Sequence, residues 1–140
     1  MFDVLVAALK CPNCNSDVPS TANTGMQTYL RSFPDGTALG IGFVFDVRDV
    51  TTESILRSGY VLITEPRGGQ PICLLDTWTC PVCETEQWAL MTISERRLQS
   101  IEAVMLDRAT LERANFISEV NADILAGSFA ADGPNGDLPT

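Results

Sequence analysis

The chain has 140 residues, of which 45% are hydrophobic and 19% are charged, a composition that excludes a disordered or collagen-like chain. Eighteen acidic against nine basic residues give a net charge of −9, so phosphate backbones should repel the protein at long range. Histidine is absent, which excludes Ser-His-Asp triads and mixed Cys/His zinc sites built from this chain alone. The length predicts one domain with tails.

Targeting signals are not evident at the start of the sequence. Residues 1–10 are apolar but carry Asp3 in place of a basic segment, so no signal peptide is predicted. Every hydrophobic run is interrupted well before the roughly 18 residues that a membrane-spanning helix needs. We therefore expect a cytoplasmic protein without a membrane association. Thiols stay reduced in that compartment, which favours metal binding over a disulfide framework for the five cysteines.

A β-rich region is predicted from residue 24 to residue 94. Residues 26–33 can form a strand that turns at 34–36 and pairs as a hairpin with a longer strand over 37–48. The longer strand alternates, and five apolar side chains share one face: Leu39, Ile41, Phe43, Phe45 and Val47. A helical turn over 51–58 and a loop over 66–71 follow. Three more strands are predicted at 60–64, 72–79 and 86–93.

The pattern changes period after Ser94. Apolar residues then recur at steps of three and four, which predicts an amphipathic helix that begins at the N-cap Ser94 and ends at Gly127. The stripe loses phase around 107–110, so one bent helix and two helices are both open. The expected organisation is a β domain over 1–94, a helical segment over 95–127 and a disordered tail over 128–140. The fold class is α+β, with an antiparallel sheet of four to six strands and one or two C-terminal helices.

Four of the five cysteines form two pairs that share the motif Cys-Pro-x-Cys. Cys11 and Cys14 are separated by Pro-Asn, and Cys80 and Cys83 by Pro-Val. Two residues between cysteines allow one tight turn to aim both sulfurs at a single ion, and two such turns supply a tetrahedral four-thiolate zinc site. The alternative for the same residues is disulfide or thiol redox chemistry.

These paired Cys-Pro-x-Cys knuckles resemble the zinc-ribbon superfamily, in particular small bacterial proteins, mostly uncharacterised, in which two knuckles flank a β-rich insert. The insert here, residues 15–79, is longer than the roughly 15 to 20 residues of a common ribbon. The chain also resembles rubredoxin, which binds iron, but it carries Asn15 and Glu84 where knuckles often have glycine. The resemblance implies Zn²⁺ as the cofactor, with iron as the alternative.

A closed four-thiolate site leaves no position for substrate, so the ion would be structural. The sequence therefore predicts a non-catalytic zinc-binding protein that acts as an interaction, accessory or regulatory subunit of a larger assembly. The partner would be another protein or a second copy, bound through the C-terminal helix. A rubredoxin-like or dithiol redox and electron-transfer protein is the first alternative. A nucleic-acid-binding zinc ribbon is the second, and the net charge of −9 disfavours it.

Other reactive residues are interpreted as structural. Cys73 alternates with apolar residues in a predicted strand, and Trp78 and Trp88 are expected to pack around the second knuckle and across its hairpin. The acidic residues show no paired spacing suited to acid and base catalysis: Asp46, Asp49, Glu53, Glu65, Asp76, Glu84 and Glu86.

Overall fold

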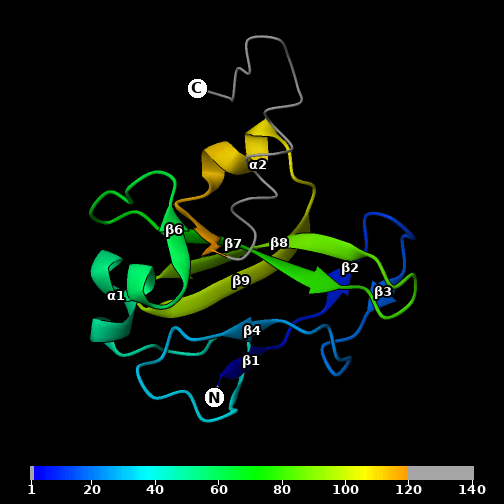
Figure 1. Cartoon of the computed structure of the whole chain (residues 1–140), viewed down its shortest axis with the longest axis horizontal. Helices are drawn as coiled ribbons and strands as arrows, with labels where there is room; N and C mark the ends of the chain where they lie inside the picture. The colour runs from blue at the N-terminus through cyan, green and yellow to red at the C-terminus, as the bar shows by residue number, and fades with distance from the viewer. Residues whose placement is uncertain (1, 120–140) are drawn as a thin grey trace.

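The computed structural model describes residues 2–119 and is mostly β-sheet. A five-stranded sheet has the order β6-β10-β7-β8-β9, a three-stranded sheet has the order β4-β1-β5, and β2 pairs with β3 (Figure 1). The strands are β1 Asp3–Leu5, β2 Leu9–Lys10, β3 Asp17–Val18, β4 Gln27–Thr28, β5 Ala38–Leu39, β6 Tyr60–Leu62, β7 Ile72–Thr79, β8 Glu86–Ser94, β9 Arg97–Val104 and β10 Phe116–Ser118. The helices are η1 Val47–Val50, α1 Thr52–Arg57 and α2 Arg108–Arg113.

The hairpin of β7 and β8 forms the middle of the large sheet. The two strands pair antiparallel from Ile72↔Ile93 to Thr79↔Glu86, and both lie where the alternating sequence predicts them. Their side chains alternate between two apolar clusters, as the pleat requires. Leu74 and Trp78 enter the main core, whereas Leu75 joins a second cluster on the opposite face.

The main core lies between the large and the small sheet. The small sheet and the segments that flank it contribute Leu5, Met26 and Leu39, which pack in one cluster with Leu74 and Phe116 of the large sheet. Figure 1 shows β1 and β4 beneath the large sheet and α2 beyond its other face. Leu111 of α2 packs there in the second cluster, so both faces of the central hairpin are covered.

The predicted helix after Ser94 is wrong over the described residues, and with it the α+β class. Glu95 (φ 52°) and Arg96 (φ 65°) form a two-residue turn that leads into β9, which pairs antiparallel with β8. Two positive φ values in succession are typical of the hairpin turn whose twist matches paired strands. The segment therefore turns back along the sheet. Residues 120–127 and the predicted tail over 128–140 lie outside the described residues.

A β-bulge explains why this strand looks helical in sequence. Ile93 pairs with Leu98 but Thr92 pairs with Ser100, so Gln99 is the extra residue in β9. Leu98 and Ile101 are consequently both buried although they are three positions apart, a spacing that would place them on opposite faces of a regular strand. The shorter α2 begins where the stripe loses phase, with the Asp107 side chain accepting the N–H of Thr110 as its N-cap.

The predicted hairpin of 26–33 with 37–48 is also wrong. Strand β1 lies between the two segments, pairing antiparallel with β4 and parallel with β5. Strand β10 likewise pairs parallel with β7, so the sheets are mixed and not purely antiparallel. Strand β5 ends at Leu39, and Gly42 takes a φ of 95°. Residues 42–45 then lie along β9, with the Gly42 N–H donating to the Leu98 carbonyl at 2.7 Å.

Several shorter predictions are correct. Helix α1 lies within the predicted helical turn over 51–58, and its N-cap Thr51 accepts the N–H of Ser54. Strand β6 lies within the predicted strand over 60–64. No helix within residues 2–119 is long and apolar enough to cross a membrane.

Candidate metal centre

The two cysteine pairs occupy turns of the same construction. In the first, the Asn15 N–H donates to the Cys11 carbonyl at 2.8 Å and the Cys11 N–H donates to the Ser16 carbonyl at 3.0 Å. In the second turn, the Glu84 N–H donates to the Cys80 carbonyl at 2.8 Å. The Cys80 N–H donates to the Thr85 carbonyl at 3.0 Å. The hairpin β2–β3 carries the first turn and β7–β8 the second. The two identical Cys-Pro-x-Cys motifs therefore adopt the same backbone conformation.

The residue after each second cysteine is in the left-handed region. Asn15 has φ 64° and Glu84 has φ 58°. Asparagine tolerates this conformation well, whereas glutamate does so at a cost of about 1–2 kcal/mol. The knuckle backbone is thus the one for which glycine is suited, and the chain forms it without glycine.

Replacing Glu84 with glycine should therefore stabilise the folded protein by about 1 kcal/mol, because relief of the left-handed strain exceeds the added freedom of the unfolded chain. Glu84 is exposed, so little packing is lost. Chemical denaturation of the metal-loaded protein measures the change. Asn15→Gly is the matched control and should have a smaller effect. Destabilisation by Glu84→Gly would contradict this account of the turn.

The four sulfur atoms lie together. All four Sγ atoms of Cys11, Cys14, Cys80 and Cys83 are within 4.8 Å of one another. Two contacts cross between the knuckles, Cys11 to Cys83 and Cys14 to Cys80, each at 3.7 Å. Metal–sulfur bonds of about 2.3 Å in a tetrahedron place sulfurs about 3.8 Å apart, whereas a disulfide bond is about 2.05 Å. The arrangement fits a four-thiolate metal site, and these cysteines are free thiols in the described residues.

Burial and hydrogen bonds divide the four thiols into two kinds. Cys11 and Cys80 are fully buried, and Cys14 and Cys83 are partly buried. The Thr85 hydroxyl lies 3.0 Å from the Cys83 sulfur and the Asn13 amide donates to it at 3.4 Å. These contacts lower the pKa of the Cys83 thiol to about 6, because they stabilise the thiolate. Burial raises the pKa of the Cys11 thiol to about 11, the penalty that a bound cation would offset.

Such a centre can hold an ion without offering it to a substrate. Four protein thiolates complete a tetrahedron, so no position is left for water or a reactant. Thiolate donors suit Zn²⁺ and also iron. An ion there would join two segments far apart in the chain, the turn after β2 and the turn between β7 and β8.

The remaining predicted residues have structural surroundings. Trp78 is buried, and its Nε1 donates to the Trp88 carbonyl at 3.1 Å, so it packs within the hairpin as expected. Cys73 is only partly buried, packs against the second cluster, and its sulfur lies 3.9 Å from the Thr92 hydroxyl.

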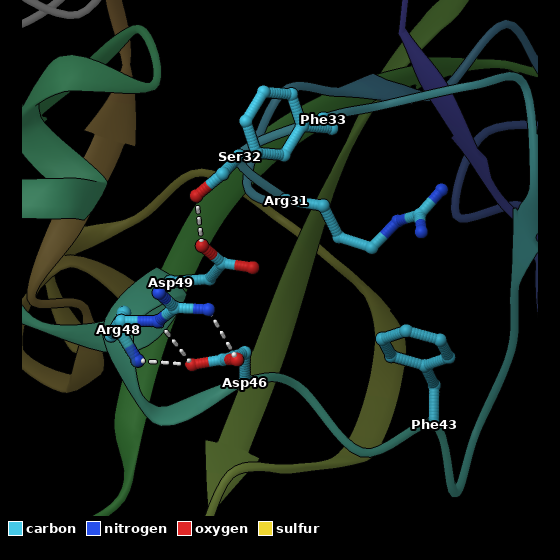
Figure 2. Close-up of a pocket in the computed structure, with 7 residues that line it drawn as sticks. All are labelled: Arg31, Ser32, Phe33, Phe43, Asp46, Arg48 and Asp49. Atoms are coloured by element: carbon cyan, nitrogen blue, oxygen red, sulfur yellow. Dashed lines mark hydrogen bonds and ion pairs between the residues drawn. The ribbon is translucent and has the colours of Figure 1, made fainter.

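Two of the predicted acids, Asp46 and Asp49, line a pocket of about 390 Å³ (Figure 2). Arg48, in the same pocket, is bound by Asp46, with a closest contact of 3.0 Å. Asp49 is buried and accepts a hydrogen bond from the Ser32 hydroxyl. Figure 2 shows Arg31 pointing away from Asp49. Its partners are Asp3, at 2.7 Å, and Asp35. Each charged group of this pocket thus already has a hydrogen-bond or ion-pair partner.

Asp76 has surroundings that the sequence analysis missed. It lies in β7 on the core-facing side, between Leu74 and Trp78, and accepts a hydrogen bond from the Tyr60 hydroxyl at 3.1 Å. Burial raises the pKa of its carboxyl to about 6 and raises the pKa of Tyr60 well above its usual value. The available signal was an acid at an inward position of an otherwise apolar alternating strand.

The fold and the site define a mostly β-sheet protein with a cluster of four cysteines at metal-binding distance. No family model, curated protein or solved structure matches the chain. The resemblance to zinc ribbons therefore rests on the two knuckles.

Proposed function

We propose that this chain is a non-catalytic zinc-binding protein of the zinc-ribbon kind, located in the cytoplasm, in which Cys11, Cys14, Cys80 and Cys83 hold one structural Zn²⁺. In this proposal the protein acts as an interaction, accessory or regulatory subunit of a larger assembly. The observation that carries the metal part is the pair of 3.7 Å sulfur contacts between two knuckles of equal construction. Four sulfurs bound to one tetrahedral ion lie at about this distance from one another.

Native mass spectrometry with elemental analysis of the same sample tests the metal assignment. One zinc per chain is the expected result. One iron with visible charge-transfer bands would replace the proposal with a rubredoxin-like electron-transfer protein. A metal-free chain that has lost two or four hydrogens would instead indicate dithiol chemistry.

The partner surface in this proposal differs from the one expected from the sequence, because residues 97–119 do not form a long helix. Large apolar side chains are exposed instead on the segment between β4 and α1: Phe33 at 88%, Ile41 at 57%, Val44 at 45% and Val47 at 58%. Several exposed apolar residues on one segment are typical of a protein-interaction surface. Figure 2 shows the Phe33 ring at the edge of its pocket.

We expect the double substitution Phe33→Ser with Ile41→Ser to abolish complex formation while leaving the melting temperature nearly unchanged, because both side chains are exposed. Size-exclusion chromatography with light scattering, on the protein alone and after co-purification, measures complex formation. Met105→Ser removes an equally exposed apolar side chain, at 68%, away from this surface and is the control. Equal assembly of the double variant and the control would count against this surface.

A further inference from the structure

A second site lies between the two sheets, away from the cysteines. A cavity of about 320 Å³ opens where β4 of the small sheet faces the ends of β6, β7 and β10 of the large one. Its volume is at the lower end of the range for small-molecule pockets. The lining includes Thr28, Tyr60, Asp76 and Ser118, which come from four different strands.

Three of these polar side chains form one row across the large sheet. Ser118 pairs with Tyr60 in the neighbouring strand, and the parallel register of β10 with β7 places Asp76 beside Ser118 on its other side. All three therefore project from the same face of the sheet. Tyr60 and Asp76 are joined by a hydrogen bond of 3.1 Å, and Tyr60 also contacts the Thr28 hydroxyl from the small sheet.

Hydrogen-bonding capacity is left over in this cavity. Ser118 is 8% exposed, lines the cavity, and its hydroxyl has no hydrogen-bond partner within residues 2–119. Every fully buried side-chain oxygen within the described residues has a hydrogen-bond partner, so the Ser118 hydroxyl is reached from the cavity and can accept a hydrogen bond from a molecule bound there. The Asp76 carboxylate accepts hydrogen bonds from the Tyr60 hydroxyl and, at 2.8 Å, from the Thr77 N–H. Its two oxygens have room for further donors.

The charges around the cavity favour a cation. None of the described residues that line it is lysine or arginine, whereas Asp76 and Glu119 are both acidic. The charge of Glu86, in β8, adds to the burial that disfavours ionised Asp76. Asp76 is partly buried, and a partly buried carboxylate without a positive partner is costly. A bound cation reduces that cost. A neutral polyol would satisfy the hydroxyls but leave this charge uncompensated.

We propose that this cavity binds the primary ammonium group of a small organic cation, with the Asp76 carboxylate as counter-ion and the Ser118 and Tyr60 oxygens as further acceptors. An ammonium group has three N–H donors, and the row of Tyr60, Ser118 and Asp76 offers three acceptors at neighbouring strand positions. The site is independent of the metal proposal, because no cysteine lines it.

The test is a titration of the full-length, metal-loaded protein with n-butylammonium chloride, followed by amide chemical shifts in ¹⁵N-labelled protein. We expect saturable shifts at Tyr60, Thr77 and Ser118, and no such shifts with n-butanol, which has the same chain without the charge. Asp76→Asn should weaken binding at least tenfold. Glu112→Gln, which removes a charge from an exposed position in α2, should bind as the wild type does.

Protonation gives an independent readout. Because the carboxyl of Asp76 titrates near pH 6 and butylammonium stays charged, binding should be roughly tenfold weaker at pH 5 than at pH 7.5. The other titratable groups that face Asp76 are Tyr60 from β6, Glu86 from β8 and Glu119 after β10; β4 contributes only uncharged residues. Glu119→Gln should retain the same pH profile.

Two results would overturn the proposal: equal shifts with butanol, or unchanged affinity in Asp76→Asn. If Asp76→Asn fails to give a dispersed spectrum, Ser118→Val serves in its place, since it fills the cavity and removes one acceptor while suiting a strand. A folded Ser118→Val variant with unchanged affinity would equally overturn the proposal.

Discussion

Replacing Cys80 with serine should lower the melting temperature strongly and abolish stoichiometric metal binding. Structural zinc contributes on the order of 10 kcal/mol of apparent binding free energy, comparable with the whole stability of a domain of this size. Cys80 is fully buried, and its sulfur lies 3.7 Å from that of Cys14 in the other knuckle. Serine cannot supply the thiolate that completes the tetrahedron.

The loss should be concentrated at the first knuckle. Strands β2 and β3 have two residues each, and an isolated two-stranded hairpin is at best marginally stable in water. The β7–β8 pairing extends over eight residue pairs and sits within a five-stranded sheet. Hydrogen exchange should therefore rise first over residues 9–18, while the amides of β7 and β8 stay protected.

Cys73→Ser is the matched control for this experiment. Cys73 is partly buried outside the four-sulfur cluster, so its replacement should cost only about 1 kcal/mol and leave metal content unchanged. A strong chelator applied to the wild type should reproduce the effect of Cys80→Ser. Unchanged melting after complete metal removal would refute a structural role for the ion.

The knuckles and the central hairpin could be predicted because local signals fix them. The Cys-Pro-x-Cys motif specifies a turn. The second motif lies between β7 and β8, whose apolar and polar residues alternate with a period of two. Strand β9 could not be predicted, since the extra residue Gln99 converts a period of two into an apparent period of three. The turn before β9 could not be predicted either. Glu95 and Arg96 take positive φ values, which in hairpin turns are usually indicated by asparagine and glycine.

Other misses have the same origin in tertiary context. The alternation over 37–48 predicts a strand, but Gly42 turns the chain and Asp46 caps η1, so only the start of the segment pairs with β1. Asp76 stood in the sequence as one of seven scattered acids. Its importance depends on Tyr60 and Ser118, and only the pairing of β10 between β6 and β7 brings these residues together.

Asp3→Ala should destabilise the protein by about 2–3 kcal/mol, because it removes a buried carboxylate that accepts hydrogen bonds from a charged guanidinium and from the backbone. The Asp3 side chain is fully buried. It accepts two hydrogen bonds from the Arg31 guanidinium, both at 2.7 Å, and two from the backbone N–H groups of Asp35 and Thr37, at 3.2 and 3.1 Å. One carboxylate thus holds the turn at 34–37 against β1. The variant removes an acceptor from each of these donors, of which the Arg31 guanidinium and the Thr37 N–H keep a bond to Asp35.

The pH dependence of this contribution has a definite sign. Hydrogen bonding with Arg31 holds the pKa of Asp3 below its usual value, so the stabilisation is present above the unfolded-state value of about 4 and is lost as the pH falls through the lower folded-state value. The stability difference between wild type and Asp3→Ala, measured by urea denaturation, should therefore be largest at neutral pH and shrink towards pH 2. Asp46→Ala removes an exposed pair with Arg48 and the N-cap of η1, and should cost about 1 kcal/mol. Equal losses in the two variants would show that the burial of Asp3 and its two backbone hydrogen bonds add nothing to the strength of its ion pair.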